Sequence, residues 1–245
     1  MHGFTQTAAS WSPLRTGLVG AGHEVVAIDA PGHGAAADVH LDLVAGGRWL
    51  ARTGGAGTYI GYSMGGRLCL HAALGAPGTV EALVLVSATG GIDDDEERRQ
   101  RRAADDALAD RIEAIGVAAF VDEWLAQPLF ATLADDAAQR DDRLRNTAAG
   151  LASSLRLAGT GTQAPLWDRL PSLTMPVLVI AGALDAKFVA LGERLAATIP
   201  TAELAVIDGA GHTVHLEQPA RFLDVLRPWL AAHADIARPS ASSPP

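Results

Sequence analysis

The residues TYIGYSMGGRLCL, numbers 58–70, join an apolar run to a helical pattern, with a serine at the junction. The central part, GYSMG at residues 61–65, fits the Gly-x-Ser-x-Gly pattern in which a serine occupies a tight turn between a strand and a helix. Small residues on both sides relieve steric crowding at such a turn. The stretch therefore predicts a nucleophile elbow that presents Ser63 at the carboxyl end of a strand.

Further apolar runs rich in β-branched residues alternate with helical patterns on both sides of the elbow. With the elbow strand itself, we expect strands over 23–29, 58–63, 82–89, 176–182 and 202–208. Helices are expected between them, over 38–53, 64–74, 187–199 and 217–233. This alternation is typical of an α/β fold, in which a mostly parallel sheet is flanked by helices.

The strand pattern stops in the middle of the chain, where charged helical faces such as DDDEERRQRR take over. We expect residues 1–89 to form the first part of the core, 90–167 a helical lid insertion and 168–235 the second part of the core. The last residues, 236–245, are rich in proline and serine, a composition that predicts a disordered tail.

The sequence His2-Gly3-Phe4 is typical of a loop that follows a strand, but the given sequence has no strand before it. The N-terminal strands of the sheet are thus missing from it. Either the start lies inside a longer reading frame, or the protein lacks a strand from the middle of its sheet. The first explanation is favoured, because losing a central strand exposes unpaired backbone on two neighbours at once.

A serine needs a base and an orienting acid to act at neutral pH, and in this type of fold they follow it in the order Asp, His. Asp185 follows the strand expected at 176–182, and His212 lies in the loop after the strand expected at 202–208. His212 would take the proton of Ser63, while Asp185 would fix the tautomer of the imidazole. The oxyanion donors would be the backbone N–H groups of Phe4 and Met64.

Each of these residues alone is as consistent with a structural role as with catalysis, but their joint order after strands favours a triad. His215 forms a His-x-x-His pair with His212, yet no further ligand cluster accompanies it, so we expect no metal site. We expect His33 to shape a loop and Cys69 to pack against the sheet.

Composition restricts the partners. The formal net charge of −9 argues against a general electrostatic grip on nucleic acid or an anionic membrane, so any anion site must be local. The single cysteine, together with the lack of a signal peptide or long apolar run, favours a soluble cytoplasmic protein. We expect no cofactor, and the sequence gives no indication of oligomeric state.

The motifs HGF, APGHG, GYSMGG, GALD and AGHTVHLEQP occur in this order, and the chain resembles the α/β-hydrolase superfamily over nearly its whole length. The insertion is similar to that of the menaquinone-pathway family of 2-succinyl-6-hydroxy-2,4-cyclohexadiene-1-carboxylate synthases. The resemblance rests on WLAQPLFATL at 124–133, RLRNTAAGLASSLRLAGTGTQAPLW at 143–167 and the segment ALDAKF.

The resemblance implies a set of substrate-binding residues: Tyr62, Arg67, Arg101, Trp124 and Arg145. The choice of Arg101 is open, because Arg98, Arg99 and Arg102 surround it and the run also fits a solvated helix face. The implied substrate is a small polycarboxylate, and the planar fork of arginine suits a carboxylate better than lysine does.

The implied reaction is an elimination in which the triad acts as a base and pyruvate leaves, without a covalent intermediate. A hydrolase of esters or of carbon–carbon bonds could use the same triad, because only the pocket determines which reaction the triad performs. A third alternative is an inactive binding protein, which the missing strand would support and the intact triad opposes.

Overall fold

The sheet consists of four parallel strands in the order β1 (Gly57–Tyr62), β2 (Val80–Val86), β3 (Val177–Gly182) and β4 (Ala202–Ile207). The computed structural model describes residues 1–233, so the predicted tail at 236–245 lies outside the described residues. Each strand ends in a loop at the same edge of the sheet, because all four run in one direction. Four of the five predicted strands are confirmed, and their carboxyl ends converge on the elbow serine.

Helices and short 3-10 turns connect the strands. Those before β2 are η1 (Ala8–Trp11), α1 (Ser12–Val19), η2 (Gly34–Ala36), α2 (Leu43–Gly54) and α3 (Met64–Gly75). The long connection from β2 to β3 contains α4 (Asp95–Leu125), η3 (Pro128–Phe130), α5 (Arg140–Arg143), α6 (Ala148–Ala158) and η4 (Trp167–Ser172). The last elements are α7 (Ala186–Thr198), α8 (Val214–Glu217) and α9 (Pro219–Ala232).

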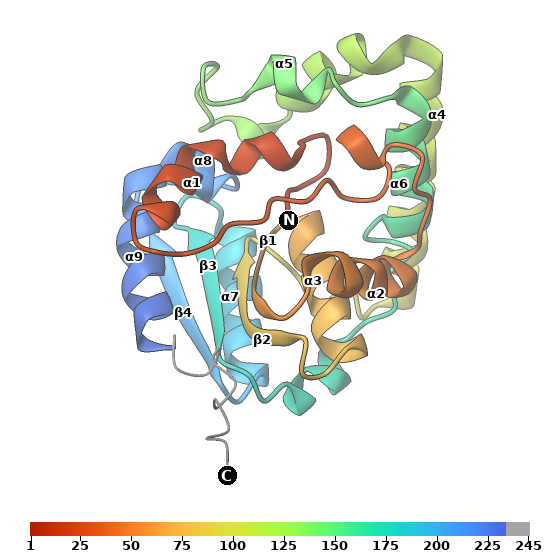
Figure 1. The fold of residues 1–245 in the computed structure, drawn as a ribbon. Coiled ribbons are helices and arrows are strands. Elements are labelled where there is room, and N and C mark those ends of the chain that lie inside the picture. Colours follow the sequence, from red (N-terminus) through yellow and green to blue (C-terminus); the bar gives the residue numbers. More distant parts are fainter. Residues whose placement is uncertain (234–245) are drawn as a thin grey trace.

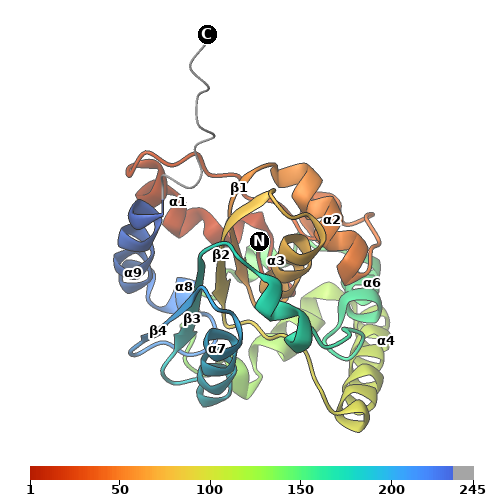
Figure 2. The same ribbon diagram turned by 90° about the horizontal axis from the view of Figure 1, so that it is seen from below.

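Both faces of the sheet are covered by helices, so the strands are apolar on both sides. On one face, α2, α3 and α7 pack against alternate strand residues that include Leu83, Leu85 and Val179. On the other face, α1 and α9 pack against the residues between them, such as Val84 and Ile180. The two layers of helices are visible on either side of the sheet in Figures 1 and 2.

The helical segment between β2 and β3 forms a separate small core. Apolar residues of α4 and α6 are buried against one another there, among them Ile112, Phe120 and Leu151. Helix α4 breaks at Gly116, whose φ of 78° is a left-handed conformation that glycine adopts without strain. In Figure 1, α4, α5 and α6 lie on one side of the sheet, where they face the loops that carry the elbow.

Residues 23–29 do not form a strand, so that prediction is wrong. A strand needs a neighbour to satisfy its backbone N–H and C=O groups. Strand β1 pairs with β2 along one edge, and within residues 1–233 only Met1 bonds the other edge. The segment 23–29 consequently has no paired strand beside it, although its apolar pattern suits one.

Candidate active site

The elbow holds Ser63 between β1 and α3 in a backbone conformation that few residues adopt, with φ 51° and ψ −111°. Its N–H donates to the carbonyl of Val86, 2.8 Å away, which ties the turn to the end of β2. A Cβ at Gly61 would lie 2.5 Å from the carbonyl oxygen of Gly65, and one at Gly65 would collide with the carbonyl of Met1. Both positions therefore require glycine, as the motif predicts.

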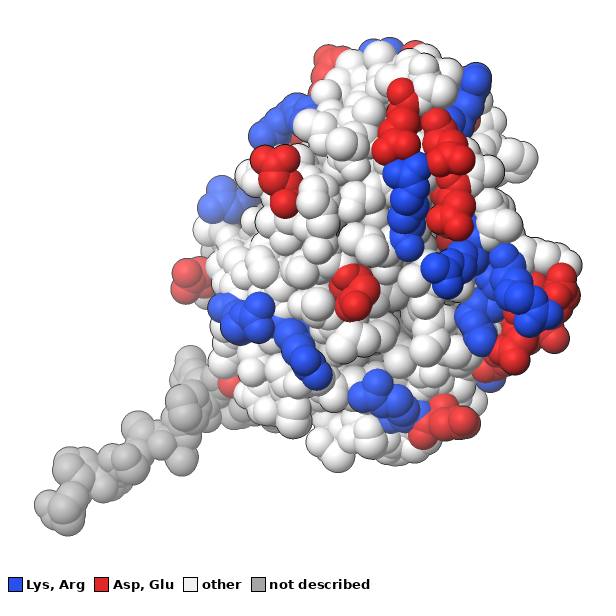
Figure 3. Space-filling view, turned by 90° about the vertical axis from the view of Figure 1, so that its right-hand side faces the viewer, with Lys and Arg blue, Asp and Glu red and all other residues white. Residues whose placement is uncertain are grey.

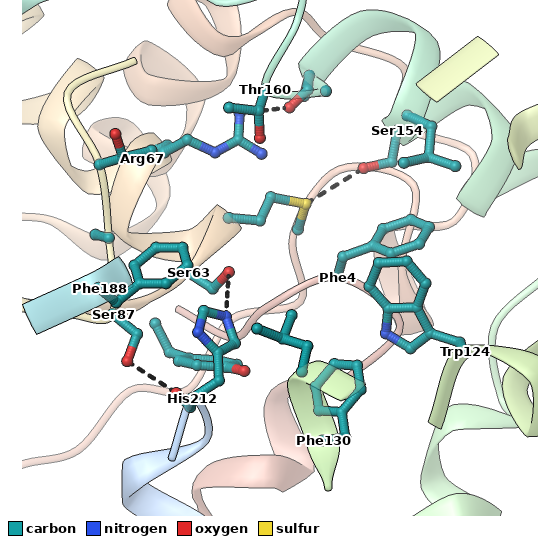
Figure 4. A pocket seen from close by; sticks show the side chains of 18 of the residues that line it. Phe4, Ser63, Arg67, Ser87, Trp124, Phe130, Ser154, Thr160, Phe188 and His212 are labelled. Carbon is teal, nitrogen blue, oxygen red and sulfur yellow. Dashed lines mark hydrogen bonds between the residues drawn. The ribbon is translucent and has the colours of Figure 1, made fainter. Parts of the chain in front are cut away.

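Asp185 and His212 reach the serine from two other strand ends. The Nδ1 atom of His212 lies 2.8 Å from Oδ2 of Asp185, and its Nε2 atom lies 3.2 Å from Oγ of Ser63. The other carboxylate oxygen of Asp185 accepts from the backbone N–H of Phe188 and caps α7. This cap fixes the carboxylate, so the three predicted residues are connected in the order that a triad needs. Figure 4 shows the contact between His212 and Ser63.

The loop that carries His212 is held by two groups outside the triad. The two oxygens of Glu217 accept from the N–H groups on either side of the histidine, from Gly211 at 2.7 Å and from Thr213 at 2.8 Å. The hydroxyl of Ser87, at the end of β2, donates to the carbonyl of His212 at 2.8 Å (Figure 4). The backbone on both sides of the imidazole is thus fixed.

Replacing Glu217 with glutamine tests this positioning. The amide retains one acceptor oxygen but places an NH₂ group against the second N–H, which removes a charge-assisted bond from the loop. We expect kcat to fall on the order of tenfold with little change in KM. Steady-state kinetics would measure this. The matched control is Glu203→Gln, at an exposed glutamate; equal losses in both variants would contradict the role of Glu217.

The backbone N–H groups of Phe4 and Met64 are the predicted oxyanion donors. Both residues line the pocket of Ser63, and within residues 1–233 neither N–H has a hydrogen-bond partner. The loop of Phe4 is set by His2, whose Nε2 accepts from the N–H of Ala30 at 2.9 Å. The ring of Phe4 meets Trp124 edge to face at 5.1 Å between centroids. This contact connects the first loop of the chain to α4.

Three arginines of different elements line the same pocket: Arg67, Arg101 and Arg143. Arg67 and Arg143 are buried, which lowers the pKa of each to about 10, so both stay protonated at neutral pH. Arg67 donates to the carbonyl of Ala158 at 2.8 Å, and Figure 4 shows its side chain directed into the pocket. Arg101 donates to the buried Asp105 at 2.8 Å. Of the arginines at 98–102, Arg101 is the one that lines the pocket.

Arg145 does not line the pocket, so its predicted place in the site is wrong. Its side chain is 62% exposed and pairs with Asp142 at 3.2 Å. Arg143, two residues earlier, is buried instead and donates to the carbonyl of Ala138 and to the hydroxyl of Thr5. Its Nη2 atom is buried and has no hydrogen-bond partner in the described part of the chain. An unpaired buried guanidinium nitrogen is a donor that an anionic ligand can satisfy.

Tyr62 and Trp124 also line the pocket. The phenol of Tyr62 shares a 3.1 Å hydrogen bond with the hydroxyl of Thr213, and burial raises the pKa of Tyr62 so that it stays protonated. Trp124 stacks on Phe120 of α4 and contacts Phe130. In Figure 4, Phe4, Trp124 and Phe130 form an aromatic wall opposite Arg67.

The arginines on the surface of the helical insertion are engaged differently. On the face shown in Figure 3, basic and acidic side chains lie next to one another. Arg111 pairs with Glu123, and Arg156 pairs with both Asp110 and Glu113. Within each exposed pair, the two opposite charges neutralise one another. The arginines of the pocket differ, because the space that they face is lined with few carboxylates.

Comparison with known proteins identifies the family. Residues 1–225 match the family described as "Alpha/beta hydrolase family".

The chain belongs to the α/β-hydrolase family.

One relative and two solved structures place this α/β hydrolase more closely. It is 37% identical to the putative 2-succinyl-6-hydroxy-2,4-cyclohexadiene-1-carboxylate synthase of Bacillus subtilis, over 95% of this chain and 89% of that protein. The structure of MenH from S. aureus superposes with a TM-score of 0.87 at 30% identity, covering 96% of this chain and 92% of the other. A thermophilic esterase from Thermogutta terrifontis gives a TM-score of 0.76 at 25% identity, with 97% and 89% covered. The protein is therefore an enzyme of the α/β-hydrolase fold, similar to these synthases.

Several residues around the site of this α/β hydrolase were not predicted: Ser87, Phe130, Arg143, Lys187, Phe188 and Glu217. Some signals for them exist in the sequence. Lys187 and Phe188 lie two and three residues after Asp185, and Ser87 directly follows a strand at the edge that carries the elbow. Glu217 lies five residues after His212, close enough to fold back on its loop. For Arg143 the sequence offers no signal that separates it from Arg145.

His215 is an internal aromatic residue in this structure. It is fully buried, stacks on Trp11 at 4.6 Å between centroids, and lies 4.6 Å from the ring of Tyr62. Within residues 1–233, no group of three potential metal ligands gathers around it or elsewhere. The same part of the chain has no helix long and apolar enough to cross a membrane.

Burial lowers the pKa of His215 from 6.5 to about 3, so the folded protein keeps this ring neutral. Unfolded chains bind a proton there below about pH 6.5, so the free energy of unfolding should decrease as the pH falls from 6.5 toward 3. At pH 5 the histidine accounts for about 2 kcal/mol of that decrease. The variant His215→Phe keeps the stacked ring. Its free energy of unfolding, measured with urea, should differ less between pH 7 and pH 5 than that of the unmodified protein. The exposed His40→Gln variant is the control, and an unchanged difference in His215→Phe would contradict the assignment.

Proposed function

We propose that this enzyme eliminates pyruvate from 2-succinyl-5-enolpyruvyl-6-hydroxy-3-cyclohexene-1-carboxylate to give 2-succinyl-6-hydroxy-2,4-cyclohexadiene-1-carboxylate. The observation that carries the proposal is the convergence of Arg67, Arg101 and Arg143 on the pocket of Ser63. The substrate has three carboxylates, and the protein has a net charge of −9. Only a local group of cations could hold such a polyanion in this protein.

The buried arginines suit carboxylates in particular. A guanidinium group can meet a carboxylate with two parallel hydrogen bonds, and Arg143 has a buried Nη2 with no partner among the described residues. Lys187, the only lysine of the chain, also lines the pocket and adds a fourth positive charge. The aromatic wall of Phe4, Trp124 and Phe130 would cover the apolar face of the cyclohexene ring.

In the proposed reaction, His212 accepts the proton of Ser63, and the serine oxygen removes a proton from the carbon next to the succinyl ketone. The electrons of that C–H bond form an enolate, whose oxygen receives hydrogen bonds from the N–H groups of Phe4 and Met64. Collapse of the enolate breaks the C–O bond to the enolpyruvyl group and forms the conjugated diene. Enolpyruvate takes up the proton held by His212 and leaves as pyruvate, while the proton removed from the substrate stays on the oxygen of Ser63. Both residues thus return to their starting states, and Ser63 remains unmodified.

Pyruvate release tests this function. The purified protein is incubated with the enolpyruvyl substrate, and pyruvate is measured with lactate dehydrogenase and NADH while the absorbance of the conjugated diene is followed. We expect pyruvate and diene to appear in equal amounts. Release of pyruvate without formation of the diene would contradict the proposal. So would a rate of pyruvate release no higher than the rate without enzyme.

Ester hydrolysis is a second candidate, because the T. terrifontis esterase superposes over nearly the whole chain. The same triad would then use Ser63 as a nucleophile and form an acyl intermediate. A p-nitrophenyl acetate assay separates the two activities. Turnover of the ester with no pyruvate from the enolpyruvyl substrate would favour the esterase.

A further inference from the structure

Phe4, whose N–H is one of the proposed oxyanion donors, lies in a tight turn formed by residues 3–6. The N–H of Gln6 donates to the carbonyl of Gly3 at 3.2 Å, and the N–H of Gly3 donates to Oε1 of Gln6 at 3.1 Å. Thr5, the third residue of the turn, has a φ of 66°, whereas the φ of Phe4 is not positive. This combination is typical of a type II turn, in which the third residue is usually glycine or asparagine. A threonine therefore occupies a position that rarely carries a branched side chain.

Thr5 does not adopt this conformation readily. A branched Cβ crowds the backbone when φ is positive, so such residues persist there only where the surrounding structure fixes them. A negative φ at Thr5 would give a different type of turn and would rotate the peptide between Phe4 and Thr5. Thr5 is fully buried, so the groups that fix it must come from neighbouring segments. The backbone of Phe4 consequently depends on the segment that holds Thr5.

That segment is 142–146, which begins inside α5 and belongs to the helical insertion. Nδ2 of Asn146 donates to the carbonyl of Thr5 at 2.7 Å, and the guanidinium group of Arg143 donates to the hydroxyl of the same threonine. Two residues further along the loop, the hydroxyl of Thr7 donates to the carboxylate of Asp142 at 2.7 Å. In Figure 1, α5 lies on the same side of the sheet as this first loop of the chain. The insertion thus holds both the backbone and the side chain of Thr5.

The side-chain amide of Asn146 makes every hydrogen bond that its two hydrogens allow. Besides Thr5, its Nδ2 bonds the carbonyl of Arg143 at 2.9 Å, and its Oδ1 accepts from the N–H of Gly34 at 2.9 Å. Two carbonyls at one end and an N–H at the other are compatible with only one orientation of the amide. Asn146 is 5% exposed and is not among the residues that line the pocket of Ser63. Its contribution must therefore act through the groups that it bonds, not through contact with substrate.

We propose that Asn146 is a positioning residue for the oxyanion donor of Phe4, because its amide holds Thr5 in the left-handed conformation on which the turn depends. Arg143 and Asn146 both bond Thr5, so the cation of the pocket and the donor of Phe4 belong to one connected unit. The inference rests on the proposed oxyanion role of Phe4. It does not depend on the reaction, since an enolate and a tetrahedral intermediate would use the same N–H. Asn146 thereby links the helical insertion to the chemistry at Ser63.

Replacing Asn146 with alanine tests this positioning. A donor interacts most strongly with the charge that develops in the transition state, so a misplaced donor lowers kcat more than it raises KM. We expect kcat to fall about tenfold, while KM changes by less than about twofold. The same split should hold for pyruvate release and for any hydrolysis of p-nitrophenyl acetate. The matched control is Asp141→Asn, at an exposed carboxylate of the same insertion, whose kcat should equal that of the unmodified enzyme.

The variant Thr5→Gly separates positioning from a general loss of stability. Glycine adopts a positive φ without strain, so this variant keeps the turn without help from Asn146. In the Thr5→Gly background, Asn146→Ala should therefore lower kcat less than about threefold. The bonds of Asn146 to Gly34 and Arg143 exist in both backgrounds. A role that acts through those bonds would lower kcat equally in both, with all variants measured well below their Tm.

Amide exchange at Gln6 reports on the turn without any catalysis. Its N–H closes the turn, so exchange should be about tenfold faster in Asn146→Ala and unchanged in Asp141→Asn. Unchanged exchange at Gln6, an unchanged kcat in Asn146→Ala, or equal losses of kcat in the two backgrounds would overturn the proposal. If the enzyme hydrolyses the ester and releases no pyruvate, the proposed function is wrong. A loss of about tenfold in the kcat for the ester would then still support the role of Asn146.

Discussion

Replacing Ser63 with alanine is expected to lower kcat for pyruvate release about 10⁴-fold or more, since members of a triad act as a unit. The hydroxyl lies 3.2 Å from Nε2 of His212, whereas the phenol of Tyr62, the other hydroxyl of the elbow, bonds the hydroxyl of Thr213. Alanine keeps the small side chain that the turn tolerates, so the fold should not change. Pyruvate release measured under single-turnover conditions, with substrate binding measured separately, would show a loss in chemistry and not in affinity.

The control for this variant is Ser172→Ala, at an exposed serine whose hydroxyl only bonds the carbonyl of Arg169. It should turn over at the rate of the unmodified enzyme. Retention of pyruvate release in Ser63→Ala, within tenfold of that rate, would show that His212 removes the substrate proton directly. In that case the serine would be a hydrogen-bonding group, and the proposed proton path would be wrong although the elimination itself could stand.

The sequence predicted the fold and the meeting of Ser63, Asp185 and His212, because both depend on short-range patterns. Strands β2, β3 and β4 are mainly apolar and contain β-branched residues, and Ser63, Asp185 and His212 each follow a strand. In a parallel sheet the ends of such strands meet at one edge, so order along the chain translates into proximity. The 2.8 and 3.2 Å contacts within the triad could not be deduced, but the meeting of the three residues could.

The strand expected at 23–29 shows where such patterns fail. Its residues have the right composition, but a strand exists only when a neighbour satisfies its backbone. Whether that neighbour is present depends on another segment of the chain, and here Met1 alone bonds the adjacent edge of β1 within the described residues. The prediction used only the residues of the segment itself, whereas the formation of a strand depends on a neighbouring strand.

The arginines illustrate a second limit. Arg143 closes α5, a helix of only four residues, and Arg145 follows it in a turn. In a long amphipathic helix the apolar positions would indicate which side faces inward, but one turn of helix has too few residues to define a face. The sequence therefore gave no sign that Arg143, and not the predicted Arg145, lines the pocket. In the structure Arg143 lines the pocket, and its guanidinium group donates to the hydroxyl of Thr5, next to Phe4.

This choice leads to a sharp prediction with a matched pair of variants two residues apart. Arg143→Ala removes a buried cation from the pocket, and charge-assisted hydrogen bonds to a carboxylate contribute about 1.5–3 kcal/mol each. We expect kcat/KM for pyruvate release to fall about 100-fold or more. Arg145→Ala removes an exposed ion pair with Asp142, which contributes at most about 1 kcal/mol to stability and nothing to the pocket. Its kcat/KM should stay within twofold of the unmodified enzyme.

Arg143 also bonds the carbonyl of Ala138 and the hydroxyl of Thr5, so its loss could act through the fold. Arg143→Lys separates the two effects, because lysine keeps the charge but not the planar fork that binds a carboxylate through two parallel bonds. Kinetics at a temperature well below the Tm of every variant should then rank the unmodified enzyme above Arg143→Lys and Arg143→Ala last. If Arg143→Ala loses stability but keeps its kcat/KM, or if Arg145→Ala causes the larger loss, the carboxylate site must lie elsewhere. A pocket that binds its substrate through Arg143 requires the opposite order. Among the described arginines, Arg143 alone has a buried guanidinium nitrogen without a partner, and it lines the pocket of Ser63.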